Sequence, residues 1–146
     1  MALSTFGAIM GFAAEMVNQT KVTYKALAEK AKDPELRDAL GQLAAEEGKD
    51  HALMERARRE HVTEMILEPI TGLYKKDYAV DLKRLEQTDD ADLLKIALMI
   101  QAQEKRFFDD ASAKVPLPEV ARIFRKISKK KEENLGRLQG LRAGQK

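Results

Sequence analysis

The stretch YKALAEKAKDPEL, residues 24–36, decides the fold because it ends one helix and begins another. Residues that favour helices, chiefly Ala, Leu, Glu and Lys, fill it as far as Ala31. Asp33 is then a favoured N-cap, and Pro34 suits the first turn of a helix. The segment therefore predicts two helices joined by a short turn, a helical hairpin that covers about residues 5–64.

The same pattern returns in the second half of the chain at a constant offset of 84 residues, the separation of Pro34 and Pro118. No gap is needed to align the two halves. A second hairpin is therefore expected over about residues 91–142. The other matched pairs are Tyr24 with Phe108, Lys30 with Lys114, Glu35 with Glu119, Leu36 with Val120, Leu40 with Phe124, Leu43 with Ile127 and Ala44 with Ser128.

Two hairpins joined by a long connection, about residues 65–90, predict one domain over residues 1–146, an all-α four-helix bundle with a crossover connection. We expect the first helix over about residues 5–31 and the fourth over about residues 118–141. The third should follow Asp89 or Asp90 as its N-cap. Inside the connection, a short helix is expected around residues 78–85.

The composition limits the chemistry of the chain. Its 146 residues contain no cysteine, which excludes disulfides, thiolate zinc sites, iron–sulfur clusters, rubredoxin-type iron centres and cysteine nucleophiles. No apolar stretch reaches the roughly 18 residues of a membrane-spanning helix. The formal net charge of +2 does not point to a polyanionic partner. We therefore expect a cytoplasmic protein without a membrane partner.

The two hairpins resemble the rubrerythrin-like branch of the ferritin-like superfamily. The resemblance is carried by residues 24–36 with LGQLAAEE, residues 40–47, and by the second hairpin from Phe107 through Ile127. It implies a ferritin-like bundle that holds two irons and acts as an oxidoreductase or peroxidase. In that family the first helix of each hairpin supplies a Glu, and the second helix supplies a Glu and, three residues later, a His on the same face.

The ligand positions implied by this resemblance are largely replaced here. Glu47 matches, and Glu104 matches an additional carboxylate that some rubrerythrins use. Asp50 stands where the first His is expected. The other positions hold Val17 and Gln101 for the two first-helix Glu residues, Lys131 for the last Glu and Asn134 for the last His.

Lys131 is the replacement with the largest physical consequence, because an ammonium group in place of a bridging carboxylate repels a metal ion. Buried alone it would be very costly, so it needs carboxylate partners. We therefore expect Lys131 to replace the metal charge at the centre of a buried network. Alternatively, Lys131 reaches outward and Asn134 faces solvent. The expected network consists of Glu47, Asp50, Gln101, Glu104, Lys131 and Asn134.

His51 lies one residue past the expected His position. A one-residue bulge would turn it inward as a metal ligand, whereas a regular helix would leave it partly exposed beside the core. The basic run at residues 125–131 favours a solvated helix face over a nucleic-acid site, since Glu132 and Glu133 follow at once and no aromatics interleave.

Two functions follow from these residues. The preferred interpretation is a non-catalytic relative without a cofactor, which has lost the di-iron centre and acts by binding or assembly as a homodimer, with a partner protein that the sequence does not identify. The alternative is an iron-binding oxidoreductase or peroxidase with an irregular ligand set, drawn from Glu47, Asp50, Glu104 and His51.

Overall fold

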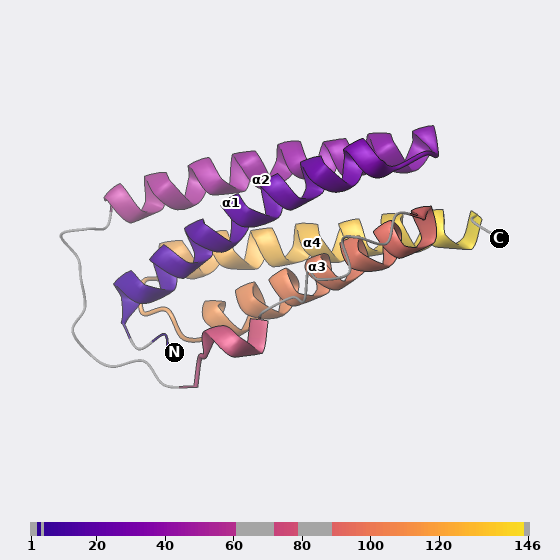
Figure 1. The fold of residues 1–146 in the computed structure, drawn as a ribbon. Coiled ribbons are helices and arrows are strands. Elements are labelled where there is room, and N and C mark those ends of the chain that lie inside the picture. Colours follow the sequence, from indigo (N-terminus) through magenta and orange to yellow (C-terminus); the bar gives the residue numbers. More distant parts are fainter. Residues whose placement is uncertain (1–2, 4, 61–71, 79–88, 145–146) are drawn as a thin grey trace.

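The computed structural model describes residues 3, 5–60, 72–78 and 89–144, and four long helices dominate this part of the chain (Figure 1). Helix α1 (Phe6–Lys30) packs against α2 (Pro34–Glu60), and α3 (Asp90–Ser112) packs against α4 (Pro118–Gly144). The prediction of an all-α four-helix bundle made of two helix pairs is confirmed. Among the described residues, no helix is long and apolar enough to cross a membrane.

The helices begin where the sequence signals place them. The side chain of Thr5 accepts a hydrogen bond from the Ala8 amide at the start of α1. Asp33 does the same for the Leu36 amide of α2, and Asp89 for the Asp92 amide of α3. Each of these caps satisfies a backbone donor that the first turn of a helix cannot pair internally.

The later helix boundaries differ in part from the expectation. α4 continues to Gly144 rather than ending near residue 141, and glycine is tolerated there within the last turns. α2 is described as far as Glu60, so its predicted extension over residues 61–64 lies outside the described part. The connection contains a short 3₁₀ helix, η2 (Lys75–Tyr78), and residues 79–85 of the expected short helix also lie outside the described residues.

The repeat of 84 residues is visible in the helices themselves. α1 and α3 begin at residues 6 and 90, α2 and α4 begin at 34 and 118, and α2 and α4 end at 60 and 144. Buried positions repeat in the same way, since Ala13 and Ala97 are both fully buried, as are Leu40 and Phe124. The two helix pairs are therefore two copies of one structural unit.

The two helices that the connection joins, α2 and α3, meet it at opposite ends of the bundle. The Asp90 carboxylate, at the start of α3, accepts hydrogen bonds of 2.9 and 2.8 Å from the amides of Lys32 and Asp33, in the turn between α1 and α2. α3 therefore begins beside the start of α2, whereas α2 ends about 40 Å away at the opposite end, as its 27 residues require. Figure 1 shows the two ends of the connection at opposite ends of the bundle.

Apolar side chains form two separate clusters along the bundle. The cluster beside η2 contains Phe107, Phe108 and Phe124, whose rings pack edge to face at centroid distances of 5.2 Å from Phe108 to each of the others. The second cluster, near the turn between α1 and α2, includes Tyr24 and Leu36. The layer between them contains the buried polar residues Glu47, Asp50, Gln101, Glu104, Lys131 and Asn134.

Asp90→Ala should destabilise the protein by about 1 to 2 kcal/mol, because two backbone amides in the turn between α1 and α2 lose their charged acceptor. Urea unfolding at neutral pH measures the change. Asp38→Ala, an exposed carboxylate on the solvent face of α2, is the matched control and should change the free energy of unfolding by less than about 0.5 kcal/mol. Equal effects of the two substitutions would show that the hydrogen bonds from the turn to Asp90 do not contribute to stability.

Candidate functional site

Lys131 of α4 lies at the centre of the buried polar layer. Its Nζ is 2.6 Å from Glu47 Oε1 and 3.1 Å from Asp50 Oδ2, both on α2. It is 3.6 Å from Glu104 Oε1 on α3 and 4.0 Å from Glu46 Oε1. The Lys131 side chain is 0% exposed, so the alternative in which it reaches solvent is wrong.

Amide side chains continue the network on the other side of the layer. Asn134 Nδ2 donates to Glu46 Oε1 at 2.7 Å and to Gln101 Oε1 at 3.3 Å. Gln101 Nε2 donates to the Tyr24 hydroxyl at 2.7 Å, which in turn donates to the backbone oxygen of Ala97 at 3.4 Å. Asn134 is 6% exposed, so the alternative in which it faces solvent is also wrong.

Helical spacing explains why these side chains meet. Glu47 and Asp50 are three residues apart on α2, and so are Lys131 and Asn134 on α4 and Gln101 and Glu104 on α3. Residues three apart share a face of a helix, and each of these faces points into the bundle. The structure thus brings together all six residues that the sequence groups in one network.

Two residues join the network beyond that expected set, and the remaining ligand position, Val17, lies in the apolar core as expected. Val17 is fully buried but belongs to the apolar cluster beside η2, and it makes no polar contact. Sequence reasoning missed Glu46 and Tyr24 as members of the network. In the sequence, nothing distinguishes Glu46 except its place beside Glu47. The repeat marks Tyr24 as an aromatic position but gives no role for its hydroxyl. Burial, with the nearby charges of Glu104 and Glu47, raises the pKa of Tyr24 well above its ordinary value, so the hydroxyl keeps its proton.

Burial has opposite consequences for the acidic and basic groups. Burial raises the pKa of Glu47 well above its ordinary value, and the charge of Glu104 adds to this, while Lys131 offsets only part of it. Burial also raises the pKa of Glu104. Burial by itself lowers the pKa of Lys131, but the charges of Glu104, Glu47 and Asp50 outweigh it and hold that pKa above its ordinary value. The ammonium therefore stays charged.

Three buried carboxyl groups, those of Glu47, Asp50 and Glu104, surround this single ammonium, and not all of their oxygens are paired. Glu47 Oε2 and both carboxyl oxygens of Glu104 are buried and accept no hydrogen bond from a donor among the described residues. The two carboxyl groups approach the same Lys131 ammonium, and the charge of Glu104 raises the pKa of Glu47. Two carboxylates offer only acceptors, so this arrangement is more stable when one of them carries a proton. The raised pKa values of both groups agree with a shared proton.

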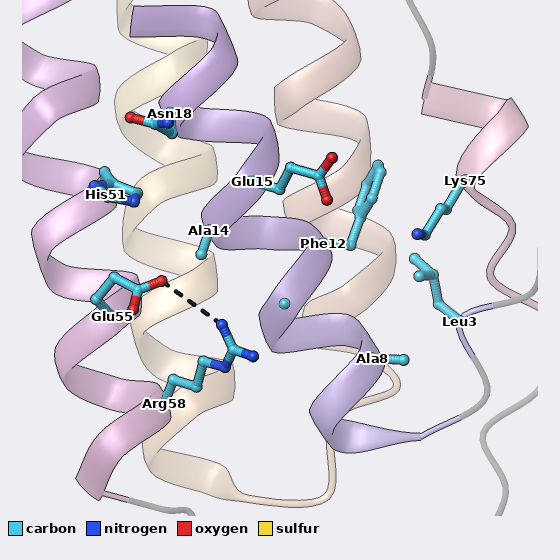
Figure 2. Close-up of a pocket in the computed structure, with 11 residues that line it drawn as sticks. Leu3, Ala8, Phe12, Ala14, Glu15, Asn18, His51, Glu55, Arg58 and Lys75 are labelled. Atoms are coloured by element: carbon cyan, nitrogen blue, oxygen red, sulfur yellow. Dashed lines mark ion pairs between the residues drawn. The ribbon is translucent and has the colours of Figure 1, made fainter.

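His51 lies outside this network. α2 is an uninterrupted α-helix from Pro34 to Glu60 and His51 is half-buried, so the expectation of a regular helix with a partly exposed His51 is confirmed and the alternative of a bulge is wrong. His51 is half-buried and, with Asn18, lines a surface cleft of about 450 Å³ that is bordered by α1 and α2. Figure 2 shows the side chains that line it. Glu55 and Arg58, which form an ion pair of 3.8 Å, line the same cleft.

The donor set does not fit a pair of iron ions. In the described part of the chain, no group of three or more His, Asp or Glu side chains is arranged to hold a metal ion. A metal bound by Glu47 and Glu104 would lie within a few ångströms of the Lys131 ammonium, which already contacts both carboxylates. The positions of the two expected imidazoles hold Asp50 and Asn134, of which the first pairs with Lys131 and the second donates an amide hydrogen bond.

Comparisons with known proteins support the fold. Neither a described protein family nor a curated protein matches this chain. Among solved structures, a hypothetical protein from Pyrococcus furiosus is similar, with a TM-score of 0.68 and 21% sequence identity over 92% of this chain and 86% of that chain. At this identity the similarity shows the four-helix fold alone.

Lys131→Met should destabilise the protein by about 3 to 5 kcal/mol at neutral pH, since it leaves the buried carboxylates without their cation. Thermal or urea unfolding measures the loss. The neighbouring Lys130→Met is the matched control, because Lys130 is exposed and should contribute less than about 0.5 kcal/mol. A small loss from Lys131→Met would mean that the ammonium is not needed in the layer.

Glu104→Gln should make stability less dependent on pH. The pKa of Glu104 is raised on folding from its ordinary value of 4.5, so the bound proton stabilises the folded state fully below that value. This stabilisation is lost as the pH rises through the folded pKa. Gln cannot lose a proton, and its amide offers a donor to the neighbouring carboxylate at every pH.

Urea unfolding of both proteins from pH 5 to pH 9 tests this expectation. The wild type should lose stability relative to Glu104→Gln as the pH rises. The exposed Glu35→Gln reports the effect of removing one surface carboxylate. Parallel curves for the wild type and Glu104→Gln would show that Glu104 holds no proton in the folded protein.

Proposed function

We propose that this protein is a ferritin-like relative of the rubrerythrin branch in which the Lys131 ammonium stands in for the metal charge, and that it acts by binding or assembly rather than by iron chemistry. One observation carries the proposal. The Lys131 ammonium is fully buried and contacts Glu47, Asp50 and Glu104, three of the positions at which the resemblance implies metal ligands.

Electrostatics supports this assignment. A dication about 4 Å from a fixed ammonium is repelled by about 8 kcal/mol at an effective dielectric constant of 20. The carboxylates that would attract the metal are already paired with the Lys131 ammonium, whose pKa stays above its ordinary value. Oxygen donors without imidazoles are also a poor ligand set for iron.

The alternative, a di-iron oxidoreductase or peroxidase, has less support. Its irregular ligand set needs His51 beside Glu47, Asp50 and Glu104, but His51 lines the surface cleft along α1 rather than the buried layer (Figure 2).

A function in binding or assembly depends on the outer surface of the bundle, and we propose that the chain assembles as a homodimer in the cytoplasm. Sedimentation equilibrium of the full chain measures that state.

Iron binding distinguishes the two functions. The purified protein, offered ferrous iron without oxygen, should retain none in stoichiometric amount after desalting. Lys131→Glu removes the ammonium and adds a carboxylate, so this variant should bind ferrous iron at least tenfold more tightly than the wild type. Lys130→Glu, on the exposed face of the same helix, is the control and should match the wild type. Two irons per wild-type chain, with peroxide-dependent oxidation, would establish the alternative.

A further inference from the structure

The contact between Glu47 and Lys131 joins equivalent positions of the two hairpins. They are 84 residues apart, which is the offset of the repeat, and yet their side chains touch at 2.6 Å. Two equivalent residues meet only where an approximate two-fold axis passes between them, so this axis runs through the contact between α2 and α4. Asp50 and Asn134, the next equivalent pair, lie beside it.

In a repeated unit with such an axis, each hairpin has two possible partners, the other hairpin or a second copy of itself. Each hairpin buries its inner face against the other, and the apolar residues of the two faces are similar. Ala13 matches Ala97, and Leu43 matches Ile127, each of them buried. A hairpin would therefore cover much of the same apolar surface by pairing with a second copy of itself. Apolar burial alone discriminates poorly between the two pairings.

The buried charges discriminate well. If hairpin one (residues 6–60) paired with another hairpin one, the layer would contain two copies each of Glu47 and Asp50 and no cation from either face. If hairpin two (residues 90–144) paired with itself, the ammonium of Lys131 would meet a second Lys131 at the axis. Each ammonium would then keep only the Glu104 carboxylate of its own hairpin, 3.6 Å away, and would lose Glu47 and Asp50. The observed pairing alone places a carboxylate against an ammonium there. Like charges that are buried together oppose association strongly.

We propose that Glu47 and Lys131 select the partner of each hairpin, so that the inner face of hairpin one accepts a face that carries Lys131, from its own chain or from a second copy of the chain, and rejects another hairpin one. The inference rests on the repeat and on the observed contact. It does not depend on whether the protein binds iron, so the two proposals fail separately.

Two full-length variants test the selection. Lys131→Glu gives both hairpins of a chain a carboxylate at the axis, and Glu47→Lys gives both hairpins an ammonium. Each variant alone should have a lower urea midpoint than the wild type. When the two are unfolded, mixed in equal amounts and refolded, each hairpin finds its complement only on the other chain. Native mass spectrometry should then show a one-to-one complex of the two variants.

The size of the enrichment decides the outcome. The complex should be at least tenfold more abundant than the homodimers of either variant, and its urea midpoint should return toward that of the wild type. Lys130→Glu mixed with Glu35→Lys is the control pair, since both positions are exposed, and it reports any exchange through other surfaces. A variant that does not fold alone but becomes soluble on mixing counts as the same rescue. Enrichment no greater than that of the control pair would overturn the proposal.

A double variant tests the same selection without intermolecular assembly. The double substitution Glu47→Lys with Lys131→Glu reverses the pair within one chain, so the charges again match. Each single variant lowers the urea midpoint, and the double variant should reverse more than half of that decrease. It should also have the oligomeric state of the wild type. A double variant no more stable than the single variants would show that packing, rather than charge, chooses the partner.

Discussion

The contact between the Lys131 ammonium and the Glu47 carboxylate is the constraint on which the middle of the bundle depends. Neither side chain reaches solvent, so each charge is tolerated only because the other is present. The contact joins α2 to α4, and Glu104 extends it to α3. These three helices must therefore keep one register, because a shift of a single turn would separate the charges and leave each of them buried alone.

A layer of this kind gives the fold little net stability. The apolar clusters on either side supply the hydrophobic driving force, whereas burying three carboxyl groups with one ammonium opposes folding until charges and hydrogen bonds are matched. The raised pKa values of Glu47 and Glu104 are the visible sign of this cost. The layer restricts how the helices can be arranged, because Lys131 of α4 must stay close to the carboxylates of α2 and α3.

The sequence predicted the fold more completely than the site, for a physical reason. Helix starts are local events, so Asp33 before Pro34 and Asp89 before α3 could be recognised without knowledge of the fold. The composition of the layer followed from the ligand positions that the resemblance to the rubrerythrin-like branch implies. The hydrogen bond from Gln101 to Tyr24 could not be predicted, because it joins residues 77 apart and depends on the side-chain conformations that packing selects. The place of His51 likewise depended on whether α2 stays regular.

The two hairpins differ in charge where they meet. Matched positions such as Leu40 and Phe124 are apolar in both, but Glu47 of one hairpin faces Lys131 of the other. A symmetric unit with carboxylates in both copies needs an added cation at its axis, and a metal ion can supply that charge. A lysine side chain in one copy supplies this positive charge as part of the chain. It also makes the inner faces of the two hairpins different from each other. We infer that exclusion of the metal and selection of the partner hairpin are two consequences of the same residue, Lys131.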